Sequence, residues 1–253
     1  MSVTDVSELS GDLARARDRV RRTAVLGTGV VVAALVLLNF AEHFLPRDGL
    51  WIAPVAALAL LGFARYRGLT WAQLGLGRDR LRSGLLWGGG AIAVVAGIYL
   101  AGILLPLSRP AFLDSRYHLG LSGALLTAFV IIPVGTVLIE EVAFRSVLWG
   151  MLSRHMKVWR VLITSSLLFG LWHVLPSLHL DSANRGVNDV MSHAGTAAGV
   201  ITIAATVAFT ALGGVVAGEL RRRSGSLLAS AGMHWATNAL GVLFGVLAWK
   251  LIG

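Results

Sequence analysis

The chain has 253 residues, of which 56% are hydrophobic and only 14% charged, and its mean hydropathy is +0.74. This composition excludes an ordinary soluble domain and indicates a protein that crosses a membrane several times. The formal net charge of +9 comes mostly from arginines in short segments between apolar runs, which favours control of membrane topology over nucleic-acid binding. The absence of cysteine excludes disulfides, thiolate metal ligands and a thiol nucleophile.

The N-terminal part begins with a polar, basic segment over residues 1–22, and the first apolar run follows at about 23–45. This run is too long for the core of a signal peptide and has no convincing small-residue cleavage site, so it predicts an uncleaved first span. We therefore expect a cytoplasmic segment over 1–22 and a transmembrane domain over 23–253.

Six further apolar runs predict an all-α, polytopic bundle of about seven spans, or eight if the second or last run is broken. The runs cover about 49–64, 84–105, 121–143, 159–178, 196–218 and 226–249. About 20 apolar residues cross the hydrocarbon core as a helix. The connecting segments alternate between arginine-rich and less basic, which predicts a cytoplasmic N-terminus in a plasma membrane. Richness in Ala, Gly, Val and Arg over Lys is typical of a bacterial genome of high GC content.

Small residues and one proline predict how these helices pack. Glycines 88–90 and the pair Gly214 and Gly218 are spaced to let helix backbones approach closely. Pro133 with Gly135 predicts a kink in the fourth span, shortly before its charged residues.

Few polar side chains lie deep in the apolar runs, and they occur in three segments. They are Glu140, Glu141 and Arg145 in the fourth run and its extension, His173 in the fifth, and His234 and Asn238 in the seventh. A charged group at the centre of a membrane helix costs about 2.5–3.5 kcal/mol on insertion scales, so such residues indicate function by default.

Helix geometry relates these residues to one another. Glu141 and Arg145 are four apart and are predicted to pair, which turns Glu140 about 100° away around the helix and leaves it free. His234 and Asn238 share one helix face for the same reason. Counting about 1.5 Å per residue from the predicted cytoplasmic ends places the free glutamate, both histidines and the asparagine near the midplane, within about two helical turns. Helix geometry therefore predicts a cavity lined by these polar residues inside the membrane.

In chain order the three segments read Glu140-Glu141-Val142-Ala143-Phe144-Arg145, Phe169-Gly170-Leu171-Trp172-His173 and His234-Trp235-Ala236-Thr237-Asn238. This pattern resembles the CAAX protease and bacteriocin-processing (CPBP) family over about residues 120–245. The resemblance implies an intramembrane endopeptidase that hydrolyses a peptide bond in a membrane-associated or leader-type substrate. It also implies that Glu140 and His173 activate a water, that His234 and Asn238 hold the oxyanion, and that Glu141 and Arg145 support the site.

These residue types suit such chemistry. A carboxylate beside an imidazole can take a proton from water and return it to the leaving amine, and imidazole and carboxamide donors can stabilise an oxyanion. Glu140, His173 and His234 are also a plausible Zn²⁺ ligand set with an open position for water, although the chain has no His-Glu-x-x-His helix. Activation without a metal and activation by zinc both stay open. Trp172 and Trp235, each beside a histidine, are predicted to be walls of the cavity.

Other functions compete with this interpretation. A proton-coupled transporter also uses intramembrane glutamate and histidine, but no internal repeat is visible. A non-catalytic membrane scaffold could keep the same pocket. Gly120-Leu121-Ser122-Gly123 matches the short nucleophile pattern of rhomboid-type serine proteases, but Ser122 is expected near the outer surface, far from His234. The expected partners are a peptide or membrane-protein substrate and the lipid bilayer, with no nucleic acid.

Overall fold

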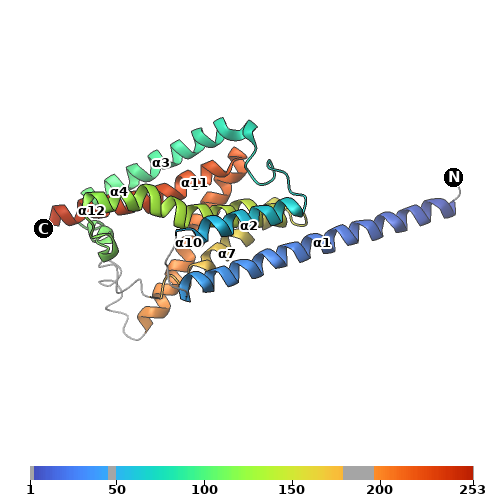
Figure 1. The fold of residues 1–253 in the computed structure, drawn as a ribbon, viewed down its shortest axis with the longest axis horizontal. Coiled ribbons are helices and arrows are strands. Elements are labelled where there is room, and N and C mark those ends of the chain that lie inside the picture. The colour runs from blue at the N-terminus through green and yellow to red at the C-terminus, as the bar shows by residue number, and fades with distance from the viewer. Residues whose placement is uncertain (1–2, 45–49, 179–196, 253) are drawn as a thin grey trace.

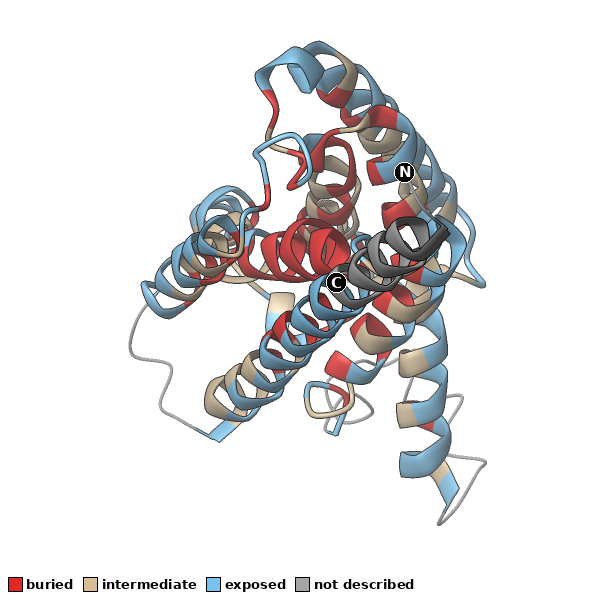
Figure 2. Cartoon of the chain, turned by 90° about the vertical axis from the view of Figure 1, so that its right-hand side faces the viewer, coloured by how far each residue is buried: buried red, intermediate tan, exposed pale blue. Residues whose placement is uncertain are grey.

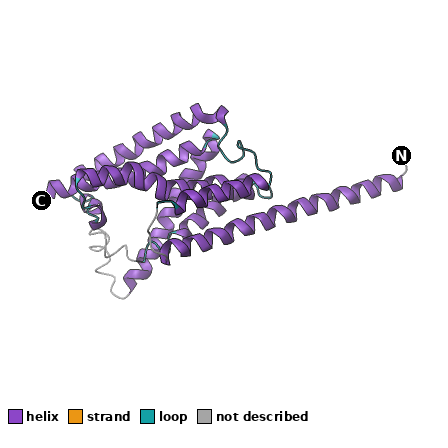
Figure 3. Cartoon of the chain, viewed as in Figure 1, coloured by secondary structure: helices purple, strands orange, loops and turns teal. Residues whose placement is uncertain are grey.

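The computed structural model describes residues 3–44, 50–178 and 197–252, and within these ranges it contains helices and no strands (Figures 1 and 3). Five segments are long and apolar enough to cross a membrane: Asp18–Phe44, Arg78–Leu104, Leu121–Leu152, Ala198–Ser224 and Leu227–Leu251. Two shorter apolar helices, Ile52–Tyr66 and Val158–Trp172, complete the bundle. The protein is a multi-pass membrane protein, as its composition predicts.

The helices follow the predicted apolar runs in order. They are α1 (Val3–Phe44), α2 (Ile52–Tyr66), η1 (Arg78–Arg80), α3 (Leu81–Leu104), η2 (Arg109–Phe112), η3 (Ser115–Tyr117), α4 (Leu121–Leu126), η4 (Thr127–Ile131), η5 (Pro133–Val137), α5 (Leu138–Glu140), η6 (Glu141–Leu148), α6 (Trp149–Leu152), α7 (Val158–Trp172), α10 (Ala198–Ser224), α11 (Leu227–Trp235), η8 (Ala236–Leu240) and α12 (Gly241–Ile252). Helices α2 and α7 have 15 residues each. Fifteen residues span about 22 Å, less than the roughly 30 Å of hydrocarbon. These two helices are therefore shorter than a complete span.

Helix α1 has 42 residues without interruption, so the polar N-terminal segment and the first apolar run form one helix. Its N-terminal part projects beyond the rest of the bundle (Figure 1). Its C-terminal part packs on the bundle through Val31 and Leu35, which belong to the main hydrophobic core.

The segment Leu121–Leu152 forms the centre of the fold. It contains three π-helical stretches, η4, η5 and η6. Pro133, at the start of η5, cannot donate a backbone hydrogen bond, so the regular α-helical ladder is interrupted where the sequence predicts a kink. Every residue from Ile139 to Leu152 is buried, and this stretch lies in the middle of the bundle (Figure 2). Turns of the π type occur frequently at functional sites.

Glycines bring several of these helices together. A Cβ atom at Gly88 would lie 2.9 Å from a carbonyl oxygen of α11, and one at Gly214 would lie 3.1 Å from a Cα atom of α7. A Cβ at Gly218 would also crowd α7. Gly89 and Gly90 have no such neighbour within 4 Å, so the predicted packing role is right for three of these glycines and wrong for two.

The arginine-rich segments gather at one end of the bundle. Arg67 Nη2 donates to the Thr23 carbonyl at 2.5 Å, and Arg154 Nη1 donates to the Arg67 carbonyl at 2.6 Å. At the same end, the backbone N–H of Leu227 donates to the Gly75 carbonyl at 2.8 Å. The segments that the charge pattern places on one side of the membrane therefore contact one another. That this side is cytoplasmic stays a prediction.

Candidate active site

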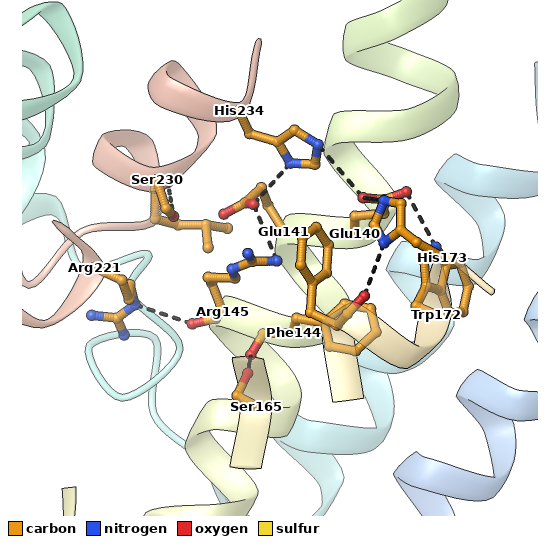
Figure 4. Close-up of polar contacts among 12 residues, drawn as sticks. Glu140, Glu141, Phe144, Arg145, Ser165, Trp172, His173, Arg221, Ser230 and His234 are labelled. Atoms are coloured by element: carbon orange, nitrogen blue, oxygen red, sulfur yellow. Dashed lines mark hydrogen bonds and ion pairs between the residues drawn. The ribbon is translucent and has the colours of Figure 1, made fainter. Parts of the chain in front are cut away.

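The predicted polar residues from three separate helical segments meet at one place (Figure 4). They line or border a cavity of about 920 Å³ whose walls come mainly from α3 and α10. The predicted site residues on the cavity wall are Glu140, Arg145, His173, His234 and Asn238. Most of the remaining lining is apolar, so the few polar groups of the site face a largely hydrocarbon-like space.

Glu140, at the end of α5, has two oxygens in different situations. Its Oε1 accepts a hydrogen bond from Trp172 Nε1 at 3.2 Å. Its Oε2 is buried and has no hydrogen-bond partner among the described residues. Instead, Oε2 lies 3.5 Å from His234 Nε2 and 4.0 Å from His173 Nε2. A buried polar atom without a partner is unusual and requires an explanation.

The partners of the two histidines define how their rings are protonated. His173 Nδ1 lies 2.8 Å from the Phe169 carbonyl, and His234 Nδ1 lies 3.0 Å from Glu141 Oε1. A carbonyl or an ionised carboxylate can only accept, so each Nδ1 must carry the proton. In a neutral ring, Nε2 then has a free lone pair. Both Nε2 atoms therefore face Glu140 as possible acceptors.

Glu141 and Arg145 lie at the buried centre of the site, with 1% and 2% of their surface exposed. Their ion pair, which the four-residue spacing predicts, has a distance of 3.5 Å from Arg145 Nη1 to Glu141 Oε1. The same carboxylate oxygen accepts from His234. The Arg145 guanidinium also lies over the ring of Phe169, 3.8 Å from its centroid, in cation–π geometry. Arg145 is thus held on two sides and helps to hold Glu141.

Asn238 lies in the π-helical turn η8, directly after the helix that carries His234. It is half-buried and lines the same cavity as Glu140. Its neighbour Thr237 is fixed, since the Thr237 carbonyl accepts from Tyr99 Oη at 2.8 Å. Within the described residues no hydrogen bond engages the Asn238 carboxamide, which leaves its N–H groups able to donate to a ligand in the cavity.

The two tryptophans beside the histidines do not line this cavity, so their interpretation as its walls is wrong. Trp172 borders a smaller cavity of about 290 Å³ between α1 and α7, and its indole holds Glu140. Trp235 donates to the Ala128 carbonyl at 2.9 Å. Adjacent helical residues point about 100° apart. The position of Trp172 next to His173 in the sequence therefore did not indicate that both side chains would lie near the Glu140 carboxylate.

Ser122, the candidate nucleophile of the serine-protease alternative, is exposed at the start of α4. It is not among the residues that line the cavity. The structure therefore separates this serine from the groups that could activate it.

A known protein family matches the part of the chain that carries the site residues. Residues 122–240 match the family described as Type II CAAX prenyl endopeptidase Rce1-like. The matched range contains all three motif segments and nearly coincides with the range of 120–245 predicted from them. No curated protein and no solved structure matches the chain. Residues 122–240 are thus a domain of the CAAX protease family, which confirms the resemblance and supports the function of a CAAX-type intramembrane protease.

Proposed function

We propose that the protein is an intramembrane endopeptidase in which the Glu140 carboxylate acts as the general base. The observation that carries this proposal is the state of Glu140 Oε2, which is buried, lacks a hydrogen-bond partner among the described residues and faces both histidine Nε2 atoms. All three atoms are acceptors when the rings are neutral. A water between them has two hydrogens to donate, one to the carboxylate and one to an imidazole. The arrangement is therefore complementary to a bound water.

The reaction then follows from a water held at this position. Its oxygen attacks the carbonyl carbon of the scissile peptide bond while one of its protons passes to Glu140. The carbonyl oxygen becomes an oxyanion in a tetrahedral intermediate. When the C–N bond breaks, Glu140 returns the proton to the leaving nitrogen, so that an amine and a carboxylic acid result. His173 orients the water through its free Nε2.

Asn238 and His234 are proposed to stabilise the oxyanion. Asn238 can donate from its carboxamide regardless of pH, and it faces the cavity. His234 Nε2 can donate only when the ring carries both protons, because its Nδ1 proton is already used toward Glu141. One oxyanion donor in a site shielded from water contributes about 3–4 kcal/mol to catalysis. Asn238 is therefore the principal donor in this proposal.

Zinc remains the alternative source of an activated water. Imidazoles whose Nδ1–H is held by a carbonyl or carboxylate are oriented as metal ligands usually are. Among the described residues, however, no group of three or more His, Asp or Glu side chains is arranged to hold an ion. We derive no step through a metal and propose that side chains alone activate the water.

The substrate is proposed to be a membrane-associated or leader-type peptide or protein. Apolar residues of α3 and α10 line the cavity while remaining exposed on the surface of the bundle, among them Val94, Ile98, Phe209 and Leu212. In a bilayer this surface is in contact with hydrocarbon, so the cavity can receive an apolar segment from the membrane.

A cleavage assay tests the proposal. Purified protein in detergent should cleave an apolar fluorogenic peptide, and Glu140→Gln should lower the rate by about 10²–10⁴-fold, the usual contribution of a general base. Glu219→Gln is the matched control, because Glu219 is a glutamate of α10 that pairs with Arg222 and Arg223, away from the cavity. Wild-type protein that cleaves nothing would favour a membrane scaffold. Full activity of Glu140→Gln would place the base elsewhere.

A further inference from the structure

The loop between α2 and η1 collects hydrogen bonds from three separate helices. Three successive carbonyl oxygens of this loop each accept one donor from a different element. The Gln73 carbonyl accepts from Arg221 Nη2 of α10 at 3.0 Å. The Leu74 carbonyl accepts from Ser146 Oγ of η6 at 2.7 Å. The Gly75 carbonyl accepts from the backbone N–H of Leu227 of α11 at 2.8 Å. We call residues 73–75 the carbonyl loop. Through these hydrogen bonds it links η6, which carries Glu141, to α11, which carries His234.

Arg221 is the side chain that reaches deepest into this arrangement. Only 6% of its surface is exposed, whereas Arg222 and Arg223 are solvent-facing and pair with Glu219. Besides the carbonyl loop, Arg221 Nε donates to the Arg145 carbonyl at 3.2 Å (Figure 4). Both acceptors are backbone oxygens rather than carboxylates. A buried cation is costly unless its donors are bonded, so these bonds hold Arg221 in place.

The carbonyl loop is shaped to receive this arginine. Gly75 has φ +76°, which disfavours any residue with a side chain, and a Cβ atom at this position would collide with the Arg221 guanidinium. The turn that precedes it is fixed by two reciprocal bonds, Thr70 N–H to Gln73 Oε1 at 2.8 Å and Gln73 N–H to Thr70 Oγ1 at 3.2 Å. The loop is therefore a rigid partner for Arg221.

We propose that Arg221 is a positioning residue for the peptidase site. It holds the Arg145 backbone of η6 and, through the carbonyl loop, the start of α11. Glu141 lies on the first of these elements and His234 on the second, and they meet at 3.0 Å although they are 93 residues apart in the chain. Arg221 is not among the residues that line the cavity, so it acts through this pair. The inference rests on the proposed peptidase function.

Kinetics of Arg221→Met test the proposal, since methionine keeps an extended side chain but removes every donor. A misplacement of about 1 Å in a catalytic site can cost about 10²-fold in rate, so kcat for the reporter peptide should fall by about 10–100-fold while KM changes little. Arg222→Met is the matched control and should change neither constant, because Arg222 is the exposed neighbour paired with Glu219.

Two further variants keep the test decisive if Arg221→Met does not fold. Arg221→Lys keeps the charge and can reach one carbonyl, so it should recover part of the lost kcat. Gly75→Ala leaves the arginine intact but displaces its guanidinium, so it should lower kcat in the same way. The thermal unfolding midpoint of each variant is measured alongside, so that loss of fold is separated from loss of rate.

The outcomes distinguish this inference from the proposed function. Wild-type protein without peptidase activity would refute the function and the positioning role together. Active wild type with wild-type kcat in both Arg221→Lys and Gly75→Ala would overturn the positioning role alone. So would a raised KM at unchanged kcat, which would place Arg221 in substrate binding, or a loss confined to the unfolding midpoint, which would make it purely structural.

Discussion

The central helical segment has two halves that differ in their surroundings. In the outer half, Leu121–Leu138, the buried residues form one stripe: Ala124, Ala128, Ile132 and Val137. This stripe packs against residues of η8 and α12, and the remaining residues of the outer half are exposed or half-buried. In the inner half, Ile139–Leu152, every residue is buried (Figure 2). The same helical segment thus changes from a membrane-facing wall into a fully enclosed core.

The distribution of polar groups follows this difference. The outer half has no charged residue, whereas the inner half contains Glu140, Glu141 and Arg145. Charge on a membrane-facing helix is costly and has no partner in hydrocarbon. In the inner half, neighbouring helices supply the partners: α7 through Trp172 and α11 through His234. In this segment, ionisable groups therefore occur only where other helices surround the helix that carries them.

The largest expected effect on stability is that of Arg145→Ala in the inner half. It leaves Glu141 buried without its cation, and breaking a buried pair in this way costs about 3–5 kcal/mol. The unfolding midpoint in detergent should therefore fall together with activity, whereas Arg222→Ala at the exposed end of α10 should change neither. A stable but inactive Arg145→Ala protein would contradict the supporting role and indicate a direct role with substrate.

A comparison of two phenylalanines tests whether the two halves differ in packing. Phe144 of the inner half is 1% exposed and packs edge-on against Phe169 and Trp172, whereas Phe129 of the outer half is 54% exposed. Truncating a buried phenylalanine costs about 3–5 kcal/mol, partly through the cavity it leaves. Phe144→Ala should therefore lower the unfolding midpoint much more than Phe129→Ala. Equal effects would show that the inner half is not the more tightly packed one.

The smallest expected difference in stability between the halves is that between alanine variants of two serines. Ser146→Ala removes the bond to the Leu74 carbonyl and should cost about 0.5–1.5 kcal/mol, the usual net value of one hydrogen bond. Ser122→Ala in the outer half should leave both the unfolding midpoint and peptide cleavage unchanged. If Ser122→Ala abolished cleavage while the fold persisted, the serine-protease alternative would regain support.

The sequence predicted the elements well because the bilayer restricts them so strongly. Within the described residues, apolar length alone indicated the five long segments and the two shorter apolar helices, and the four-residue spacing indicated that Glu141 pairs with Arg145. These are properties of one helix at a time, and they follow from local geometry. Counting depth along each helix, together with the family resemblance, then indicated that three helices share a site, and residues 122–240 match the family model.

Contacts between distant segments could not be predicted in this way. Glu141 is shared with His234, Trp172 holds Glu140, and Arg221 binds the backbone at Arg145. No spacing rule links residues that are tens of positions apart. The π-helical turns were also not predicted, although they set the direction of each side chain in η6 and η8. The sequence therefore predicted candidate site residues, but it did not predict the hydrogen bonds between distant segments that position them.

In the proposed mechanism the Glu140 carboxylate, helped by His173, activates water without a metal. Elemental analysis of active protein, combined with the peptide assay in a strong chelator, tests it most directly. Protein purified without added metal should contain no stoichiometric zinc, and cleavage should persist in the chelator. About one zinc per chain, lost together with activity and restored with it on re-addition, would contradict the claim and assign Glu140, His173 and His234 to the metal.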